Sequence, residues 1–541
     1  MTDTESNARY LRAWLQLKLE ARTPLHVGSG SFAEMLDRVP GERKELRKRL
    51  QSNDRKPTYR AMPTRLDHKG RELVCIPGAT IKGVLGNTLR GRLDEGYFKQ
   101  IFASSEDSGR VGKASRQIGR VRFSDSRSIV SPSFVQALDS GSDSGAERFP
   151  PLWCAERGTG VRARVAIDPV TGAAKRHHLT FFEFVPEGSR IEFRFQCFDI
   201  GKAALEAFCQ ALAELDGIQV GAGAALGAGE LGWADREPIH AEAVTQQQFA
   251  AWCLNPQAAD SVPHHSVWPA HSNHRKHDAI TADTRSIPLT LVAIDPVLIT
   301  SGLDRDEKDS EGERKLGKYP DDLYVLQTPG GQVQIPASSL RGAIRARARK
   351  ILIIWLRHFF PEQLNGDSAR ATNKAGEWAD HLLESLFGST AMASAVQVSD
   401  FTSTQSFARS QLHHQHFNAI DRFTGGVAKG ALYEAWAAPV GTLFKGRIAF
   451  RQGKQPATWA RLLLGLVLRD FARGDIPVGW GRAKGYGGLQ LSLGQSSLSK
   501  LLSIDTDLNE DRLKQIIAEM LPIGSATAMA GHKDQEVSTH E

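Results

Sequence analysis

The chain contains two copies of one pattern, and this duplication limits its possible folds more than any other feature. IPGATIKGVLGNTLRGRL begins at Ile76, and IPASSLRGAIRARARKIL begins 259 residues later at Ile335. VGAGAALGAGELGW from Val220 likewise matches VGWGRAKGYGGLQL from Val478, 258 residues later. Two unrelated motifs that recur in the same order at nearly the same separation indicate a duplicated domain. Two copies of about 210 residues also suit a chain of 541 residues better than one domain does.

Within each copy the apolar pattern predicts strand, helix, strand, strand, helix, strand. This is the ferredoxin-like order, so the expected fold class is α+β, with helices on one face of an antiparallel sheet. Two strands are expected on either side of the turn in LTFFEFVPEGSRIEFRFQCF. In the first copy the elements are expected at 15–21, 79–93, 121–128, 179–198, 205–217 and 220–233, and in the second copy the series runs from Leu289 to the glycines at 479–488.

Composition shifts predict the domain boundaries. We expect a first domain at 1–235, a linker or insertion rich in His and Pro at 236–286, a second domain at 287–495 and a tail at 496–541 that is part helix and part disorder. The linker histidines do not favour a metal site, because cysteines, acidic partners and i, i+4 spacing are missing; they are His264, His265, His271, His274 and His277.

Composition also limits the class of protein. Hydrophobic residues make up 41% and charged residues 24%, and no apolar run reaches the roughly 18 residues of a membrane span. The polar start has no apolar signal core, and five scattered cysteines suggest neither disulfides nor a zinc site. We therefore expect a cytoplasmic protein with no membrane partner. The net charge of +7 is mild, so a polyanion must be held by local stripes of charge.

The second Ile-Pro motif opens a basic helix. Arg341, Arg345 and Arg349 follow one another at i, i+4 and i+8, which places three guanidinium groups on one stripe. Ser338 or Ser339 is expected to cap the first turn, and a helix start of this kind can receive an anion. A solvated basic face is the alternative. The recurrence of the motif in both copies favours anion binding.

Several segments together resemble one known family. They are TPLHVGSG at Thr23, IPGATIKG at Ile76, LFGS at Leu386 followed by VSDF, IDRFTGG at Ile420 and VGWGRAKGYGG at Val478. The chain resembles the RAMP superfamily, the CRISPR-associated proteins of type III effector complexes. It looks like a tandem fusion of two backbone subunits, and the second copy resembles them more closely.

The resemblance implies that the partners are guide RNA (crRNA), target RNA and other CRISPR effector subunits. It also implies that polar loops at 130–178 and 403–431 splay a base of the guide–target duplex. It further implies that the glycine-rich segments from Val220 and Val478 pack close to RNA, although their glycines could equally serve tight turns that need a positive φ. By the same resemblance, the RNA-binding candidates are Lys82, Arg90, Ser338, Ser339, Arg341, Arg345, Arg349, Gly479, Gly481, Arg482, Lys484 and Gly485.

Some backbone subunits cleave the bound target, and these carry an aspartate ahead of the Ile-Pro motif. Asp322 occupies the matching place, with Asp321 as its rival, while Ala61 falls there in the first copy. The resemblance implies that Asp322 holds Mg²⁺ or another divalent cation, which stabilises charge on the scissile phosphate while the 2′-hydroxyl attacks. Loop aspartates are otherwise usually solvated turn formers.

Three functions therefore remain open. The first is a crRNA-binding backbone subunit that acts as a metal-dependent endoribonuclease on target RNA, in antiviral defence. The second is a scaffold that binds crRNA without cutting. The third is an endoribonuclease that processes the crRNA precursor. Only His26 and the cluster His413, His414 and His416 support this function. His26 is expected to be structural.

Overall fold

The computed structural model describes 21 segments of the chain. They are residues 9–38, 58–66, 69–70, 72–102, 119–129, 152–154, 157–168, 174–215, 217–233, 239–245, 248–249, 254, 264–268, 286–300, 323–328, 330–364, 369–389, 391–428, 432–450, 457–492 and 509–521. Asp321, Asp322, most of the linker histidines and residues 522–541 lie outside these segments.

The first repeat is built on an antiparallel sheet with the order β12-β13-β1-β11-β6. The last strand of the repeat, β13, lies beside the first, β1, and β11 separates β1 from β6. This is the ferredoxin-like arrangement, so the predicted fold class is confirmed. Its strands are β1 (Arg9–Ala21), β6 (Val121–Phe123), β7 (Arg127–Ile129), β11 (Arg190–Gly201), β12 (Gly217–Gln219) and β13 (Glu230–Trp233).

Alternation along β1 decides which face of this sheet the helices cover. Alternate residues from Ala13 to Ala21 are buried, and the apolar side chains of β11 meet them from the neighbouring strand. The helices of this repeat pack against that face, where Phe102 stacks on Phe123 and meets Phe208 edge to face. They are α2 (Gly78–Leu89), α3 (Glu95–Phe102) and α5 (Lys202–Ala213).

The second repeat has the same sheet with the order β18-β20-β23-β16-β24. Its helices include α8, which the sequence analysis did not predict, and α11, whose Leu513 and Ile517 complete this core. The strands are β16 (Ser286–Ala293), β18 (Gln332–Ile335), β19 (Val396–Val398), β20 (Phe401–Ser406), β23 (Leu443–Phe450) and β24 (Leu489–Ser492), and the helices are α7 (Ala337–Phe359), α8 (Ala369–Phe387), α9 (Thr458–Ala472) and α11 (Glu510–Met520).

Each repeat also carries a second, smaller sheet that the sequence analysis missed. The strands on either side of the Pro-Glu-Gly turn do form, but only β11 joins the main sheet. β10 pairs with β9 and, in parallel, with β3; in the second repeat β22 pairs with β21 and, in parallel, with β17. The bounds are β2 (Phe32–Glu34), β3 (Thr58–Arg60), β8 (Leu152–Cys154), β9 (Thr159–Ile167), β10 (Ala174–Phe184), β17 (Leu323–Tyr324), β21 (His413–Phe417) and β22 (Tyr433–Ala437), and a separate hairpin joins β4 (Thr64–Leu66) to β5 (Glu72–Val74).

Part of the predicted linker belongs to the first repeat. β14 (Ile239–Thr245) pairs with β1, and β15 (His264–Trp268) pairs with β14. The first domain therefore continues past residue 235, because β13 covers only the end of β1 and leaves the rest of its edge for β14. The composition shift at 236 therefore does not mark the end of the sheet.

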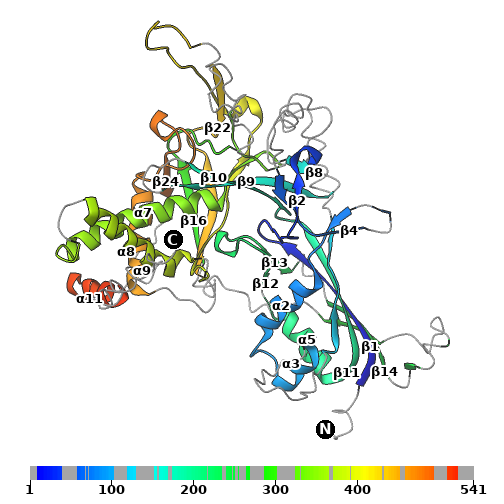
Figure 1. Cartoon of the computed structure of the whole chain (residues 1–541). Helices are drawn as coiled ribbons and strands as arrows, with labels where there is room; N and C mark the ends of the chain where they lie inside the picture. The colour runs from blue at the N-terminus through cyan, green and yellow to red at the C-terminus, as the bar shows by residue number, and fades with distance from the viewer. Residues whose placement is uncertain are drawn as a thin grey trace, which may run out of the picture.

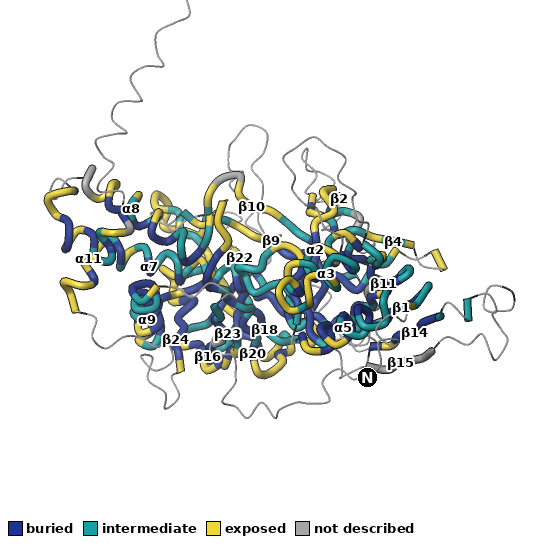
Figure 2. The backbone as a smooth tube through the Cα atoms, turned by 90° about the horizontal axis from the view of Figure 1, so that it is seen from below, coloured by how far each residue is buried: buried dark blue, intermediate teal, exposed yellow. Residues whose placement is uncertain are grey.

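The two repeats are in contact through several segments. β9 and β10 extend from the first repeat toward the second (Figure 1). Arg162 on β9 forms an ion pair with Asp400 of the second repeat at 2.7 Å. In a second ion pair the second repeat supplies the arginine, Arg447, and the first repeat supplies the carboxylate, Glu230. Figure 2 shows buried chain in both repeats, with exposed residues mainly at turns and loops. None of the described helices is both long and apolar enough to cross a membrane.

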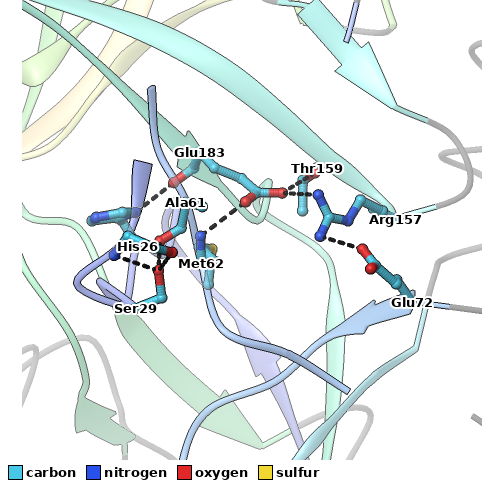
Figure 3. Close-up of polar contacts among 9 residues, drawn as sticks. His26, Ser29, Ala61, Met62, Glu72, Arg157, Thr159 and Glu183 are labelled. Atoms are coloured by element: carbon cyan, nitrogen blue, oxygen red, sulfur yellow. Dashed lines mark hydrogen bonds and ion pairs between the residues drawn. The ribbon is translucent and has the colours of Figure 1, made fainter. Parts of the chain in front are cut away.

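A buried carboxylate holds the small sheet of the first repeat together (Figure 3). Glu183 on β10 is fully buried, and it accepts hydrogen bonds from the Met62 amide and the Thr159 hydroxyl, each at 2.9 Å. The Arg157 guanidinium lies 3.9 Å from the same carboxylate and 2.7 Å from that of Glu72. Glu183 thus connects β10 to β9 and to the chain that follows β3.

Glu183→Ala is expected to lower the free energy of unfolding by about 3–5 kcal/mol, because it leaves the Met62 amide and the Thr159 hydroxyl buried without their acceptor. Glu72→Ala is the matched control at the Arg157 guanidinium. The Glu72 side chain is 57% exposed, so its loss is expected to cost no more than about 1 kcal/mol. Urea unfolding followed by circular dichroism measures both. Equal losses in the two variants would contradict the central role of Glu183.

Candidate nucleic-acid interface

An open groove with a volume of about 2490 Å³ lies between the repeats, and we call it the inter-repeat groove. The first repeat contributes β9, β10 and the loop at 222–228, and the second contributes the start of α7 and the loop at 477–484. Its charge is strongly positive, with ten Lys or Arg against three Asp among the described lining residues. The basic residues are Arg60, Arg162, Arg164, Lys175, Arg341, Arg345, Arg349, Lys350, Arg482 and Lys484, and the acidic ones are Asp168, Asp380 and Asp400.

The start of α7 is capped differently from the prediction. Pro336 is the N-cap residue, and neither Ser338 nor Ser339 forms a side-chain cap. Asp400, which follows β19, accepts a hydrogen bond from the Ala337 amide at 2.7 Å. The serines still line the groove, so the helix start faces it through their polar side chains. Capping by a serine was wrong because the N-cap position is taken by Pro336, which has no side-chain acceptor, and Asp400 in the turn between β19 and β20 supplies the acceptor instead.

The same device is present in the first repeat. Pro77 is the N-cap residue of α2, and Asp125 accepts a hydrogen bond from the Gly78 amide at 2.8 Å. A side chain at Gly78 would lie 2.0 Å from the Phe123 carbonyl oxygen, so the helix start is packed tightly against β6. In both repeats one amide of the helix start is therefore already used by the protein.

The predicted stripe on α7 lines the inter-repeat groove through Arg341, Arg345 and Arg349. Burial, with Arg345 and Arg164 close by, lowers the pKa of Arg341 to about 10, and it therefore remains protonated at neutral pH. Arg341 also lies over the Phe387 ring at 5.5 Å. Like charges gathered in a partly desolvated groove favour an anionic ligand.

Not all of the arginines on α7 are available to a ligand. Arg349 binds Asp380 through two hydrogen bonds of 3.0 Å, and Arg347 binds Asp470 at 2.6 Å. The sequence showed no acidic residue within the helix itself, but the fold supplies these two from α8 and α9. Arg345 forms no ion pair with any described residue.

The glycine loops serve both tight turns and the groove. Gly479 and Gly481 have φ values of 95° and 74° and line the groove in the second repeat, and a side chain at Gly479 would lie 2.4 Å from the Leu298 carbonyl oxygen. Gly485 has a φ of 76° but is not among the lining residues. The turn requirement alone accounts for these glycines.

Basic and aromatic side chains meet at the second glycine loop. The Lys484 ammonium lies 5.0 Å from the ring centroids of Phe417 and Trp480 and 2.7 Å from the Tyr433 hydroxyl. Arg482 also lines the groove. Flat rings beside cations are the usual platform for single-stranded nucleic acid.

Two predicted RNA-binding residues lie apart from this groove. Lys82 is exposed on α2, and Arg90 follows the end of α2 with its guanidinium 5.4 Å from the Phe98 ring centroid. Neither is among the residues that line the inter-repeat groove. The first repeat therefore presents its helix start on a different surface.

The structure does not test the predicted catalytic aspartates, because both lie outside the described residues. The strand pairings of the two repeats can nevertheless be compared. Arg60 pairs with Phe182 three residues before the bridge at Val185, and Leu323 pairs with Ala435 three residues before the matching bridge at Ala438, so Arg60 corresponds to Leu323. Ala61 therefore corresponds to Tyr324, and the sequence alignment that set Ala61 against Asp322, the predicted catalytic residue, is shifted by two residues. Tyr59, which precedes Arg60, is buried.

The histidines singled out from the sequence have separate environments. His26 is buried, and its Nδ1 lies 2.6 Å from the Glu183 carbonyl oxygen. Burial lowers the pKa of His26, against the smaller raising effect of that hydrogen bond. His413 packs against Tyr486, whereas His414 lies near Glu434. His26 is thus fixed by the fold, as expected.

Comparison with protein families supplies the identity of the fold. The model of the RAMP superfamily matches residues 18–231 and 290–490, which are the two repeats. The chain belongs to the RAMP superfamily. No curated protein matches the sequence.

Among solved structures, a similar chain occurs in the cryo-EM structure of the type III-B Cmr-beta bound to cognate target RNA. The sequences are 14% identical, the match covers 40% of this chain and 95% of that chain, and the TM-score is 0.25. A likeness of this size carries no argument about function.

Sequence reasoning missed the two residues that organise the RAMP helix starts, Asp125 and Asp400. Both follow a serine directly after a short strand, in FSDS and VSDF. This shared Ser-Asp pair was visible in both copies, but only the fold shows that it meets the Ile-Pro motif across the sheet. Asp400 differs from Asp125 in one respect, because its second oxygen binds Arg162, and both of these side chains are at most 10% exposed.

Asp400→Ala is expected to destabilise the protein by about 3–5 kcal/mol, because it leaves the buried Arg162 guanidinium without its anion. Asp125→Ala removes only the helix-start acceptor and is expected to cost about 1 kcal/mol. The midpoints of urea unfolding measure the difference. A smaller effect at Asp400 than at Asp125 would show that the ion pair between the RAMP repeats does not stabilise the fold.

Proposed function

We propose that this RAMP protein is a backbone subunit of a type III CRISPR RNA-guided effector complex, which binds crRNA and cleaves the paired target RNA. The observation that carries the proposal is the positively charged inter-repeat groove, in which both glycine loops and the basic stripe of α7 converge. A groove whose charges come from both repeats suits a ligand that continues from one repeat to the next, as an RNA strand does.

The groove suits recognition of the RNA backbone. Arg341 and Arg345 offer guanidinium groups without fixed carboxylate partners among the described residues, and phosphates would supply the missing charge. Ser338 and Ser339 add hydroxyl donors at the helix start. These contacts read no base edge, so a guide of any sequence would be held equally.

Arg345→Glu is expected to weaken RNA binding by roughly tenfold and to reduce the slope of log K against log salt by about 0.7 for each phosphate that the variant no longer binds. Lys82→Glu tests the helix start of the first repeat and is also expected to weaken binding. Lys514→Glu is the control, because Lys514 is exposed on α11 and is not among the groove residues. Retention of several unrelated RNA sequences against rising salt measures all three variants. Parental binding by Arg345→Glu would exclude the groove as the RNA site.

The segment between β21 and β22 suits the role of splaying a base. It extends away from the body of the second repeat (Figure 1). Asp421 organises it by accepting hydrogen bonds from the Phe423 and Thr424 amides at 2.9 and 2.8 Å, and these bonds lower the pKa of Asp421. Phe423 is fully exposed. An apolar ring held out by an ordered turn is suited to insertion between stacked bases.

Cleavage is assigned to Asp322 by the family resemblance. Of the three aspartates among the described groove residues, Asp380 and Asp400 are bound to arginines, which leaves only Asp168 and therefore no cluster of oxygen ligands for Mg²⁺ there. Asp322 would therefore hold the cation together with phosphate oxygens of the RNA. The bound cation would stabilise charge on the scissile phosphate, and the protein's own part is to fix the RNA backbone and unstack the base beside the cut.

Asp322→Ala is expected to leave crRNA binding intact and to lower the rate of target cleavage by about 100-fold or more, because the charge stabilisation at the phosphate is removed. Asp321→Ala is the matched neighbour and is expected to keep most of the activity. Cleavage of guide-complementary RNA with Mg²⁺ and with EDTA measures both. Cutting at the parental rate by Asp322→Ala would favour a scaffold, and EDTA-resistant cutting of the crRNA precursor would favour the processing enzyme.

A further inference from the structure

Three polar side chains converge on one face of the β21–β22 hairpin. His414 and His416 are two residues apart on β21, so their side chains lie on the same face of the strand. His416 is directly opposite Glu434 on β22. The Nε2 atoms of both histidines lie 2.9 Å from the Glu434 carboxylate, each on a different oxygen. The ligand atoms of the three residues lie within 4.8 Å of one another.

The orientation of His414 is fixed by stacking. Its ring lies parallel to that of Trp436, with centroids 3.8 Å apart and an interplanar angle of 11°. The Arg409 guanidinium lies 4.3 Å from the Trp436 centroid, and at these distances it must occupy the other face of the ring. The Nε2 atom of His414 is thereby held toward Glu434 and away from Arg409.

This cluster is separate from the inter-repeat groove. Neighbours along a strand alternate between its faces, so His413, Gln415 and Phe417 point to the opposite side. There Gln415 accepts a hydrogen bond from the Tyr486 hydroxyl, and Phe417 packs on Trp480 at the second glycine loop. None of the three converging residues lines the groove.

The geometry points to a divalent transition-metal site, of the Zn²⁺ class, formed by His414, His416 and Glu434. Two imidazoles and one carboxylate are the ligand types that such ions prefer, whereas Mg²⁺ requires a shell of oxygens. The metal takes the place of the protons that now join the imidazoles to the carboxylate, and exposure of the cluster leaves a coordination position open to water or a ligand. The site goes beyond the proposed function, and it ties β21 to β22 at the base of the projecting segment.

Cobalt provides a direct test because tetrahedral Co²⁺ with imidazole ligands absorbs visible light. The full chain, freed of metal, is titrated with CoCl₂, and we expect one equivalent to give the absorption bands and ZnCl₂ to remove them. His416→Ala is expected to weaken Co²⁺ binding by more than the ~10- to 100-fold that loss of an outer partner costs. Glu434→Gln is expected to act in the same direction, and circular dichroism confirms that each variant is folded.

Two controls separate this site from other histidines. His413→Ala changes a neighbour on the opposite face of β21 and is expected to keep the bands. The double variant His271→Ala, His274→Ala alters the histidine-rich segment and is also expected to keep them. If the parent chain gives no bands, or if they persist in His416→Ala and disappear in the double variant, the site at the hairpin does not exist. RNA binding measured in parallel reports on the groove independently.

Discussion

The ion pair between Arg162 and Asp400 is the interaction on which the arrangement of the two repeats depends. One oxygen of Asp400 holds the start of α7 and the other holds a strand of the first repeat. The guanidinium of Arg162 also binds Gln334 and lies over the Phe184 ring. A single carboxylate thus sets the position of the basic helix relative to β9, and the walls of the inter-repeat groove follow from it.

The groove itself is a balance of paired and unpaired charge. Asp380 and Asp400 neutralise Arg349 and Arg162 in the groove, and Asp470 neutralises Arg347 outside it. On α7, Arg341 and Arg345 remain for a ligand. This division explains why a mild net charge of +7 is compatible with a strongly positive surface. The bulk charge of the chain gives little information about where an anion would bind.

How far the sequence could predict this depends on the range of the interactions. The duplication, the order of elements and the stripe on α7 were predictable because they rest on local periodicity and on repetition. The role of Asp400 was not predictable, because its carboxylate accepts a hydrogen bond from an amide 63 residues away, and a contact over that distance leaves no periodic pattern in the sequence. The small sheets were missed for a similar reason: β3 and β17 are short and pair in parallel with distant strands. Asp322 remains a prediction from family resemblance.

The glycine loops show how a duplication can place different demands on corresponding glycines of the two copies. Gly227 and Gly485 both follow a short turn of helix with a left-handed backbone. A side chain at Gly227 would lie 2.9 Å from the Val398 carbonyl oxygen of the other repeat, while the same position at Gly485 is open. During divergence of the copies, Asn could replace Gly485 because it tolerates this backbone, whereas Gly227 can accept no side chain while the two halves stay in contact. One of the two corresponding turns has thus become part of an interface, and only the glycine of the other turn, Gly485, has space for a side chain.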